Sequence, residues 1–123
     1  MPTATPVENF RLHQMGNGRL FLLKLSDDNG TRIWEFSLST KVLRETTFDK
    51  KRIHHQGAVA SSLQSIYLSG SLLKNGRRVS QFNMATQKWS DLPMLNFKKT
   101  NHAMILFSAQ YLYAVGDMEH VSM

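Results

Sequence analysis

The 123-residue chain contains no cysteine. A scaffold held together by disulfides and a zinc site built on thiolates are therefore excluded, and the composition suits a reducing compartment. No apolar run reaches the roughly 20 residues that a membrane-spanning helix needs, and the first ten residues have neither the basic nor the apolar segment of a secretory signal. The sequence predicts a soluble intracellular protein of the cytoplasm.

Acidic residues are also scarce, because 9 Asp and Glu stand against 15 Lys and Arg and give a formal net charge of +6. This excess favours acidic partners, and charge alone would admit acidic peptides, nucleic acids or anionic lipids. We expect the basic segments to lack the exposed, interleaved aromatic residues on which single-stranded bases stack. We therefore expect an acidic protein or peptide partner, and neither a nucleic acid nor a membrane.

Motifs of common catalytic sites are missing: the chain has no nucleophile elbow, no P-loop, no zinc-protease motif and no dinucleotide-binding motif. His54 and His55 follow a basic segment, but adjacent side chains do not converge on one metal ion, and no close set of further ligands accompanies them. The sequence predicts a protein that is not an enzyme and that holds no metal and no cofactor.

What the sequence does contain is a repeat. Similar apolar segments begin at Leu20, Ile66 and Leu112, so the step is 46 residues (66 − 20 and 112 − 66). The same step superimposes further residues without a gap: Asn29-Gly30 on Asn75-Gly76, Arg32 on Arg78, Ile33 on Val79, Phe36 on Phe82, Leu43 on Trp89, and Glu45 on Asp91. Self-similarity at a fixed period of this length indicates a repeat architecture.

Each period has the pattern of strand, turn, strand, turn, with no helical stretch. In the second period, apolar, β-branched and aromatic residues concentrate in four short runs, at 56–61, 65–70, 78–84 and 88–92, which turn-forming residues separate. The sequence therefore predicts a four-stranded antiparallel meander in each period.

The first period contains a half-buried strand pattern. Trp34, Phe36 and Leu38 alternate there with Ile33, Glu35 and Ser37. Buried packing is the commonest use of aromatic residues in strands, so we expect these rings to pack between neighbouring sheets.

The order of motifs in the second period resembles the kelch repeat. The apolar strand "IYLSG" ends in glycine, and it is followed by "VSQFNMATQKWSDLPM", which contains an aromatic strand, Thr-x-x-Trp and Leu-Pro-Met, and then by His102. The resemblance covers about residues 10 to 117 and implies an all-β fold of kelch-type β-propeller blades, with His102 packing on an innermost strand. Glycine suits the strand end because the backbone turns there with φ above zero. The paired glycines of the family are replaced by Ser69-Gly70 and Gly116-Asp117.

The expected organisation is an N-terminal tail at 1–9, repeats at approximately 10–46, 52–92 and 98–117, of which the last is partial, and a C-terminal tail at 118–123. Closed propellers have about four to eight blades, so two to three blades form an incomplete propeller. Its terminal blades would leave apolar faces uncovered. We expect further blades or self-association to complete it.

Strand alternation places the loops after the second and the fourth strands on one rim, and the opposite rim offers only Lys41 and Lys88. In kelch proteins these loops commonly build the partner-binding face. The resemblance therefore implies a binding site made of Lys50, Lys51, Arg52, Lys74, Arg77, Lys98 and Lys99. A solvated surface without a partner is the plainer alternative, since loop lysines are usually exposed.

The function that the resemblance implies is a non-catalytic interaction scaffold that binds its partner through these loops. Two other uses of the family stay open. A substrate adaptor of a cullin-linked ubiquitin ligase would need a second domain. A propeller enzyme that acts on sugars ranks below both, because no motif of such chemistry is present.

Overall fold

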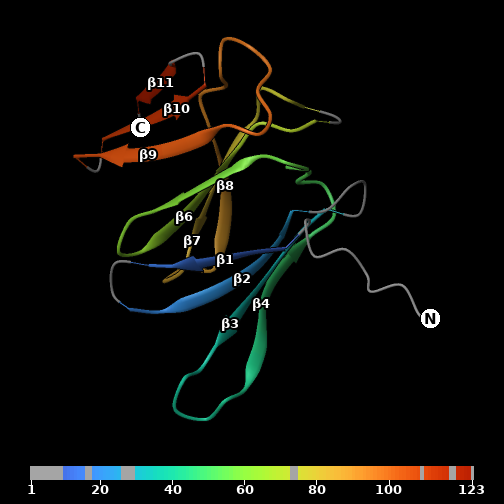
Figure 1. Ribbon diagram of the computed structural model, residues 1–123, viewed down its shortest axis with the longest axis vertical. Coiled ribbons are helices and arrows are strands. Elements are labelled where there is room, and N and C mark those ends of the chain that lie inside the picture. Colours follow the sequence, from blue (N-terminus) through green and yellow to red (C-terminus); the bar gives the residue numbers. More distant parts are fainter. Residues whose placement is uncertain are drawn as a thin grey trace.

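The structure is a computed structural model that describes residues 10–15, 18–25, 30–72, 75–108, 110–116 and 119–122. Within these ranges the regular structure consists of β-strands in three antiparallel sheets, without a helix (Figure 1). The all-β fold expected from the sequence is confirmed. The N-terminal tail expected at 1–9 lies outside the described residues.

Each sheet is built from strands that are consecutive in the chain. Sheet 1 contains β1 (Phe10–Gln14), β2 (Leu20–Leu25), β3 (Thr31–Phe36) and β4 (Leu43–Asp49). Sheet 2 contains β5 (Ala58–Ser61), β6 (Ser65–Ser69), β7 (Val79–Asn83) and β8 (Lys88–Leu92). Sheet 3 contains β9 (Ala103–Phe107), β10 (Tyr111–Val115) and β11 (Glu119–Ser122). Within each sheet, every strand pairs with the strand that precedes or follows it in the chain, so all three sheets are meanders.

Two strands extend beyond the expected repeats. The sequence predicts a C-terminal tail from residue 118, but β11 occupies Glu119–Ser122 and pairs with β10. The first repeat is expected to end at residue 46, whereas β4 continues to Asp49. Both extensions contain polar residues and lack the apolar pattern that predicts a strand. They are strands because they pair with a neighbouring strand.

The 46-residue step is present in the strand register. Leu20 pairs with Phe36 across β2 and β3, and the equivalent Ile66 pairs with Phe82 across β6 and β7. The pairing of Phe36 with Leu43 and of Glu35 with Arg44 across β3 and β4 recurs at the same step in β7 and β8, and the match ends at the register shift between Ile33 and Trp34. Residues 46 positions apart therefore take the same place in the strand pairing of sheet 1 and of sheet 2.

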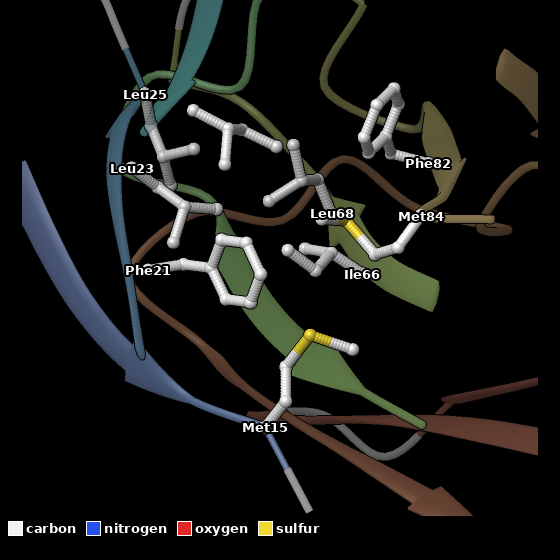
Figure 2. Close-up of a cluster of buried hydrophobic side chains, with 9 residues drawn as sticks. Met15, Phe21, Leu23, Leu25, Ile66, Leu68, Phe82 and Met84 are labelled. Atoms are coloured by element: carbon white, nitrogen blue, oxygen red, sulfur yellow. The ribbon is translucent and has the colours of Figure 1, made fainter. Parts of the chain in front are cut away.

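A buried hydrophobic cluster joins sheets 1 and 2 (Figure 2). One face of β2 and β3 meets one face of β6 and β7. The cluster contains Met15, Phe21, Leu23, Leu25, Ile33, Ile66, Leu68, Phe82 and Met84, none of which is more than 7% exposed. Full burial of one such side chain stabilises the folded state by roughly 1.5–3 kcal/mol, so this contact fixes the two sheets against each other.

A second cluster joins sheets 2 and 3. It contains Ala58, Ala60, Tyr67, Val79, Leu95, Met104, Leu112, Ala114 and Val121. Sheet 2 thus buries both of its faces, and every residue of β6 is buried. The sheets follow one another in chain order, with sheet 2 between the other two (Figure 1).

The aromatic residues expected between sheets take two positions. Phe82 is fully buried, and Trp89 packs on it with ring centroids 4.9 Å apart, at the contact with sheet 1. Trp34 lies on the other face of sheet 1, where its ring centroid is 6.0 Å from that of Phe10. Ile33 is the residue of β3 that enters the core, because alternation directs its face toward sheet 2.

Candidate functional site

The loops that follow β4, β6 and β8 meet at one end of the sheets. Backbone hydrogen bonds join them, with the donor amide named first: Leu72 to His55 (2.8 Å), Ser71 to Lys99 (3.0 Å), Asn101 to Gln56 (2.8 Å) and Lys99 to Gly76 (3.1 Å). We call residues 50–57, 70–72, 75–78 and 93–102 the loop rim. Strand alternation thus brings the loops after the second and fourth strands together.

Close approach of two backbones at the loop rim requires glycine at position 70. Gly70 has φ +75°, and a Cβ there would overlap the carbonyl oxygen of Lys99. A residue with a side chain would be strained at this φ and would also collide with the neighbouring loop. Glycine ends β6 for both reasons.

The seven basic residues expected at the site lie in different environments. Lys50, Lys51, Arg77 and Lys98 are exposed. Arg52 is only 8% exposed and Lys99 only 6%, so neither belongs to the exposed surface that the sequence indicated. Lys74 lies outside the described residues.

Arg52 is held by polar contacts between sheets 1 and 2. Its Nη1 donates to Asp91 Oδ1 (2.7 Å) and to Ser80 Oγ (3.1 Å). Its Nε donates to Asp49 Oδ2 (3.1 Å), and its guanidinium lies 5.2 Å from the centroid of the Trp89 ring. Charge-assisted hydrogen bonds of this kind are strong and directional. Arg52 therefore serves the contact between the sheets.

His54 lies beside this network and is fully buried. Its Nδ1 is 2.8 Å from the Gly70 carbonyl oxygen, and its Nε2 is 2.8 Å from Ser80 Oγ. With Nδ1 donating to the carbonyl, Nε2 accepts from the Ser80 hydroxyl. Burial lowers the pKa of His54 to about 4, so the imidazole is neutral at pH 7. Both ring nitrogens thus have structural partners, and no three His, Asp or Glu side chains gather as a metal site within the described ranges.

One ion pair recurs at the 46-residue step. Arg78 Nε lies 3.1 Å from Asp91 Oδ1 in sheet 2, and Arg32 Nε lies 3.6 Å from Glu45 Oε2 in sheet 1. Hydrogen bonds from Arg78 and then from Arg52 lower the pKa of Asp91, so its carboxylate stays charged. In both sheets an arginine in or just before the third strand pairs with a carboxylate of the fourth strand.

A pocket of about 650 Å³ opens at the loop rim beside Asp91. Its lining consists of Asn75, Gly76, Arg77, Arg78, Asp91, Leu92, Met94 and Lys98, and we call it the basic pocket. Three cationic side chains face it against one carboxylate, which is already paired. Leu92 and Met94 add apolar contact. Such a lining can accept a carboxylate that stands next to an apolar group.

The two loops of the basic pocket are fixed to each other. The Leu95 amide donates to the Arg77 carbonyl (2.8 Å), and Arg77 Nε donates to the Leu95 carbonyl (2.6 Å). Arg78 Nη1 donates to the carbonyl oxygen of Lys51 (2.8 Å). The pocket is therefore formed before any ligand binds.

Sequence reasoning identified two of the pocket's cations, Arg77 and Lys98. It did not include Arg78 or the apolar Leu92 and Met94 among the site residues. The Leu-Pro-Met motif was the available signal, because it marks the loop after the fourth strand. Lys50 and Lys51 are exposed at the loop rim without lining the pocket.

No protein-family model matches the chain, and no curated protein sequence matches it either. The resemblance to kelch repeats rests on the residues quoted above. Among the described residues, no helix is long and apolar enough to cross a membrane.

Proposed function

We propose that the three sheets are consecutive blades of a kelch-type β-propeller and that the protein is a non-catalytic interaction module. Its ligand is an acidic protein or peptide segment bound at the basic pocket. Three antiparallel meanders in series, packed face to face at a 46-residue step, support the architecture. The convergence of Arg77, Arg78 and Lys98 on one preformed pocket carries the functional proposal.

The chemistry of the lining defines the preferred ligand. A guanidinium recognises a carboxylate through two parallel hydrogen bonds, and an ammonium adds charge without fixed geometry. A methionine adapts to apolar groups of varied shape. We therefore expect Asp or Glu next to a Leu or Met in the bound peptide. The net charge of +6 would speed the encounter with such a segment.

Charge reversal at the pocket tests this proposal. Fluorescently labelled peptides that place Asp or Glu beside Leu or Met are titrated with the protein, and binding is followed by anisotropy at several salt concentrations. We expect Arg77→Glu/Lys98→Glu to weaken binding by about tenfold or more and to flatten its salt dependence, since two attractive contacts become repulsive.

The matched control is Lys41→Glu/Lys88→Glu, which changes the net charge equally at exposed positions on the opposite rim. This control variant should bind almost as the unmodified protein does. Equal weakening by both variants, or by neither, would show that the loop rim is only a solvated basic surface.

A further inference from the structure

Among the described residues, sheets 1 and 3 each have one apolar face that packs on no other sheet. In sheet 1 the strand pairing places Phe10, Leu12, Leu20, Leu22, Trp34 and Phe36 on that face. In sheet 3 it places Ala103, Ile105, Phe107, Tyr111, Tyr113 and Val115 there. Leu12 is 70% exposed and Ile105 is 55% exposed. Sheet 2, by contrast, buries both faces against its neighbours.

The repeat identifies the open face of sheet 3. We call the face that packs on the next sheet along the chain the forward face, and the opposite one the back face. Phe21 lies on the forward face of sheet 1, and Tyr67, 46 residues later, lies on the forward face of sheet 2. The next residue at this step is Tyr113, which lies on the open face of sheet 3. That open face is therefore a forward face.

The same comparison identifies the open face of sheet 1. Ile66 lies on the back face of sheet 2 in contact with sheet 1, and Leu112 lies on the back face of sheet 3 in contact with sheet 2. The equivalent residue of sheet 1 is Leu20, which lies on its open face. Both contacts inside the chain join a forward face to a back face, and the chain displays one more face of each kind.

Two copies could meet with two back faces in contact or with a back face against a forward face, and the charges favour the second arrangement. The back face of sheet 1 also carries Glu45 and two cations, Lys24 and Arg32, whose charged groups lie 5.6 Å from the Phe10 ring and 4.2 Å from the Phe48 ring. The cations outnumber the carboxylate, so two back faces in contact would bring an excess of positive charge together. The forward face of sheet 3 brings aliphatic groups and tyrosines, and tyrosine rings attract cations.

We infer that the back face of sheet 1 packs on the forward face of sheet 3 of a second copy of this chain, and that two copies close one ring. This inference rests on the propeller architecture proposed above. Propellers contain about four to eight blades. The described residues of one copy form three sheets, and six is the only multiple of three in that range. Head-to-tail contacts form a closed ring when the rotation closes.

Two single substitutions test the contact, one on each face. Leu12→Lys charges the back face of sheet 1, and Ile105→Lys charges the forward face of sheet 3, both at exposed positions. In sedimentation experiments the 123-residue chain should have twice its mass of 14.1 kDa, and each variant should have the mass of one chain. Leu63→Lys, at an exposed apolar turn position, is the control and should leave the mass unchanged. Far-UV circular dichroism checks that the variants keep their strands.

Mixing the two variants tests the head-to-tail arrangement. The Leu12→Lys copy keeps its forward face and the Ile105→Lys copy keeps its back face, so an equimolar mixture should associate again, more weakly than the unmodified protein. A mixture that stays monomeric would overturn the inference. So would dissociation by one substitution only, a monomeric unmodified chain, or a mass that grows without limit, which would mean that the contact does not close. Peptide binding to the Leu12→Lys monomer tests the proposed function separately, because the basic pocket is not on either face.

Discussion

Single residues that are adjacent in the chain have different roles at the loop rim. Lys51 is exposed, whereas Arg52 is 8% exposed and forms ion pairs with Asp49 and Asp91. The guanidinium can satisfy three acceptors in fixed directions, and its stem packs against apolar groups. Arg52 thus connects the loop after sheet 1 to the strands of sheet 2.

Removal of each side chain should therefore have unequal effects on stability. We expect Arg52→Ala to lower the free energy of unfolding by about 2–4 kcal/mol, because it removes a buried guanidinium that bonds to Asp49, Ser80 and Asp91 and packs on Trp89. Lys51→Ala should change it by less than about 0.5 kcal/mol. Urea unfolding of both variants measures the difference. Similar losses for the two would contradict the assignment of Arg52 to the contact between sheets.

The sequence alone could not show that Lys51 is exposed and that Arg52 is buried. Both lie in one basic segment of the sequence, but the depth of each side chain depends on the path of the loop and on Asp91, which is 39 positions away from Arg52 in the chain. The sequence could not predict the basic pocket for the same reason, because Arg77 and Met94 line one pocket only after two loops have folded against each other.

At the scale of strands, the sequence predicted the second repeat almost residue for residue. The run expected at 65–70 corresponds to β6 at Ser65–Ser69, and the run expected at 88–92 coincides with β8 at Lys88–Leu92. Both are bounded by residues that favour turns, which makes their ends readable. β11 escaped prediction because it is stabilised by pairing with β10. The face of β3 that enters the core was likewise set by its neighbours.

The end of β6 provides a test at this scale. Gly70 and Gly18 both have positive φ, at +75° and +82°, but an added Cβ would overlap the Lys99 carbonyl at Gly70 and would meet no atom within 4 Å at Gly18. We expect Gly18→Ala to destabilise the protein by about 1 kcal/mol, from backbone strain alone. Gly70→Ala should cost about 3 kcal/mol or more, because strain and collision add.

Chemical unfolding of the two glycine variants measures these losses. Equal values would mean that the loop carrying Lys99 moves away at little cost, and that the loop rim is less closely packed than its hydrogen bonds indicate.

For the whole molecule, acid should weaken the fold through His54. The pKa of His54 is lowered to about 4 by burial, whereas an unfolded chain protonates histidine near 6.5. The unfolded state therefore gains the proton first. The neutral imidazole contributes its full stability above pH 6.5, and this contribution is lost as the pH falls through 4, by roughly 3 kcal/mol in total.

Urea unfolding between pH 4.5 and pH 7.5 measures this loss. His54→Gln should be less stable at pH 7.5 and should show a much flatter dependence over this range. The pKa of Asp91 is lowered, so its contribution is complete above the ordinary carboxyl pKa and is lost as the pH falls from that value through the lowered one, below the range in which His54 acts. A variant that keeps the slope of the unmodified protein would show that another group is responsible.

Different groups determine the shape of the basic pocket and its chemical character: main-chain hydrogen bonds fix the shape, and side chains provide the charge and the apolar contact. Amides and carbonyls of the main chain hold the two loops together, whereas Met94 and Lys98 are exposed side chains carried on that frame. Little loop entropy is lost when a ligand arrives at a surface that is already ordered. Exposed side chains can also be exchanged without moving their neighbours. A different ligand can thus be selected at this position by substitution alone, with the scaffold unchanged.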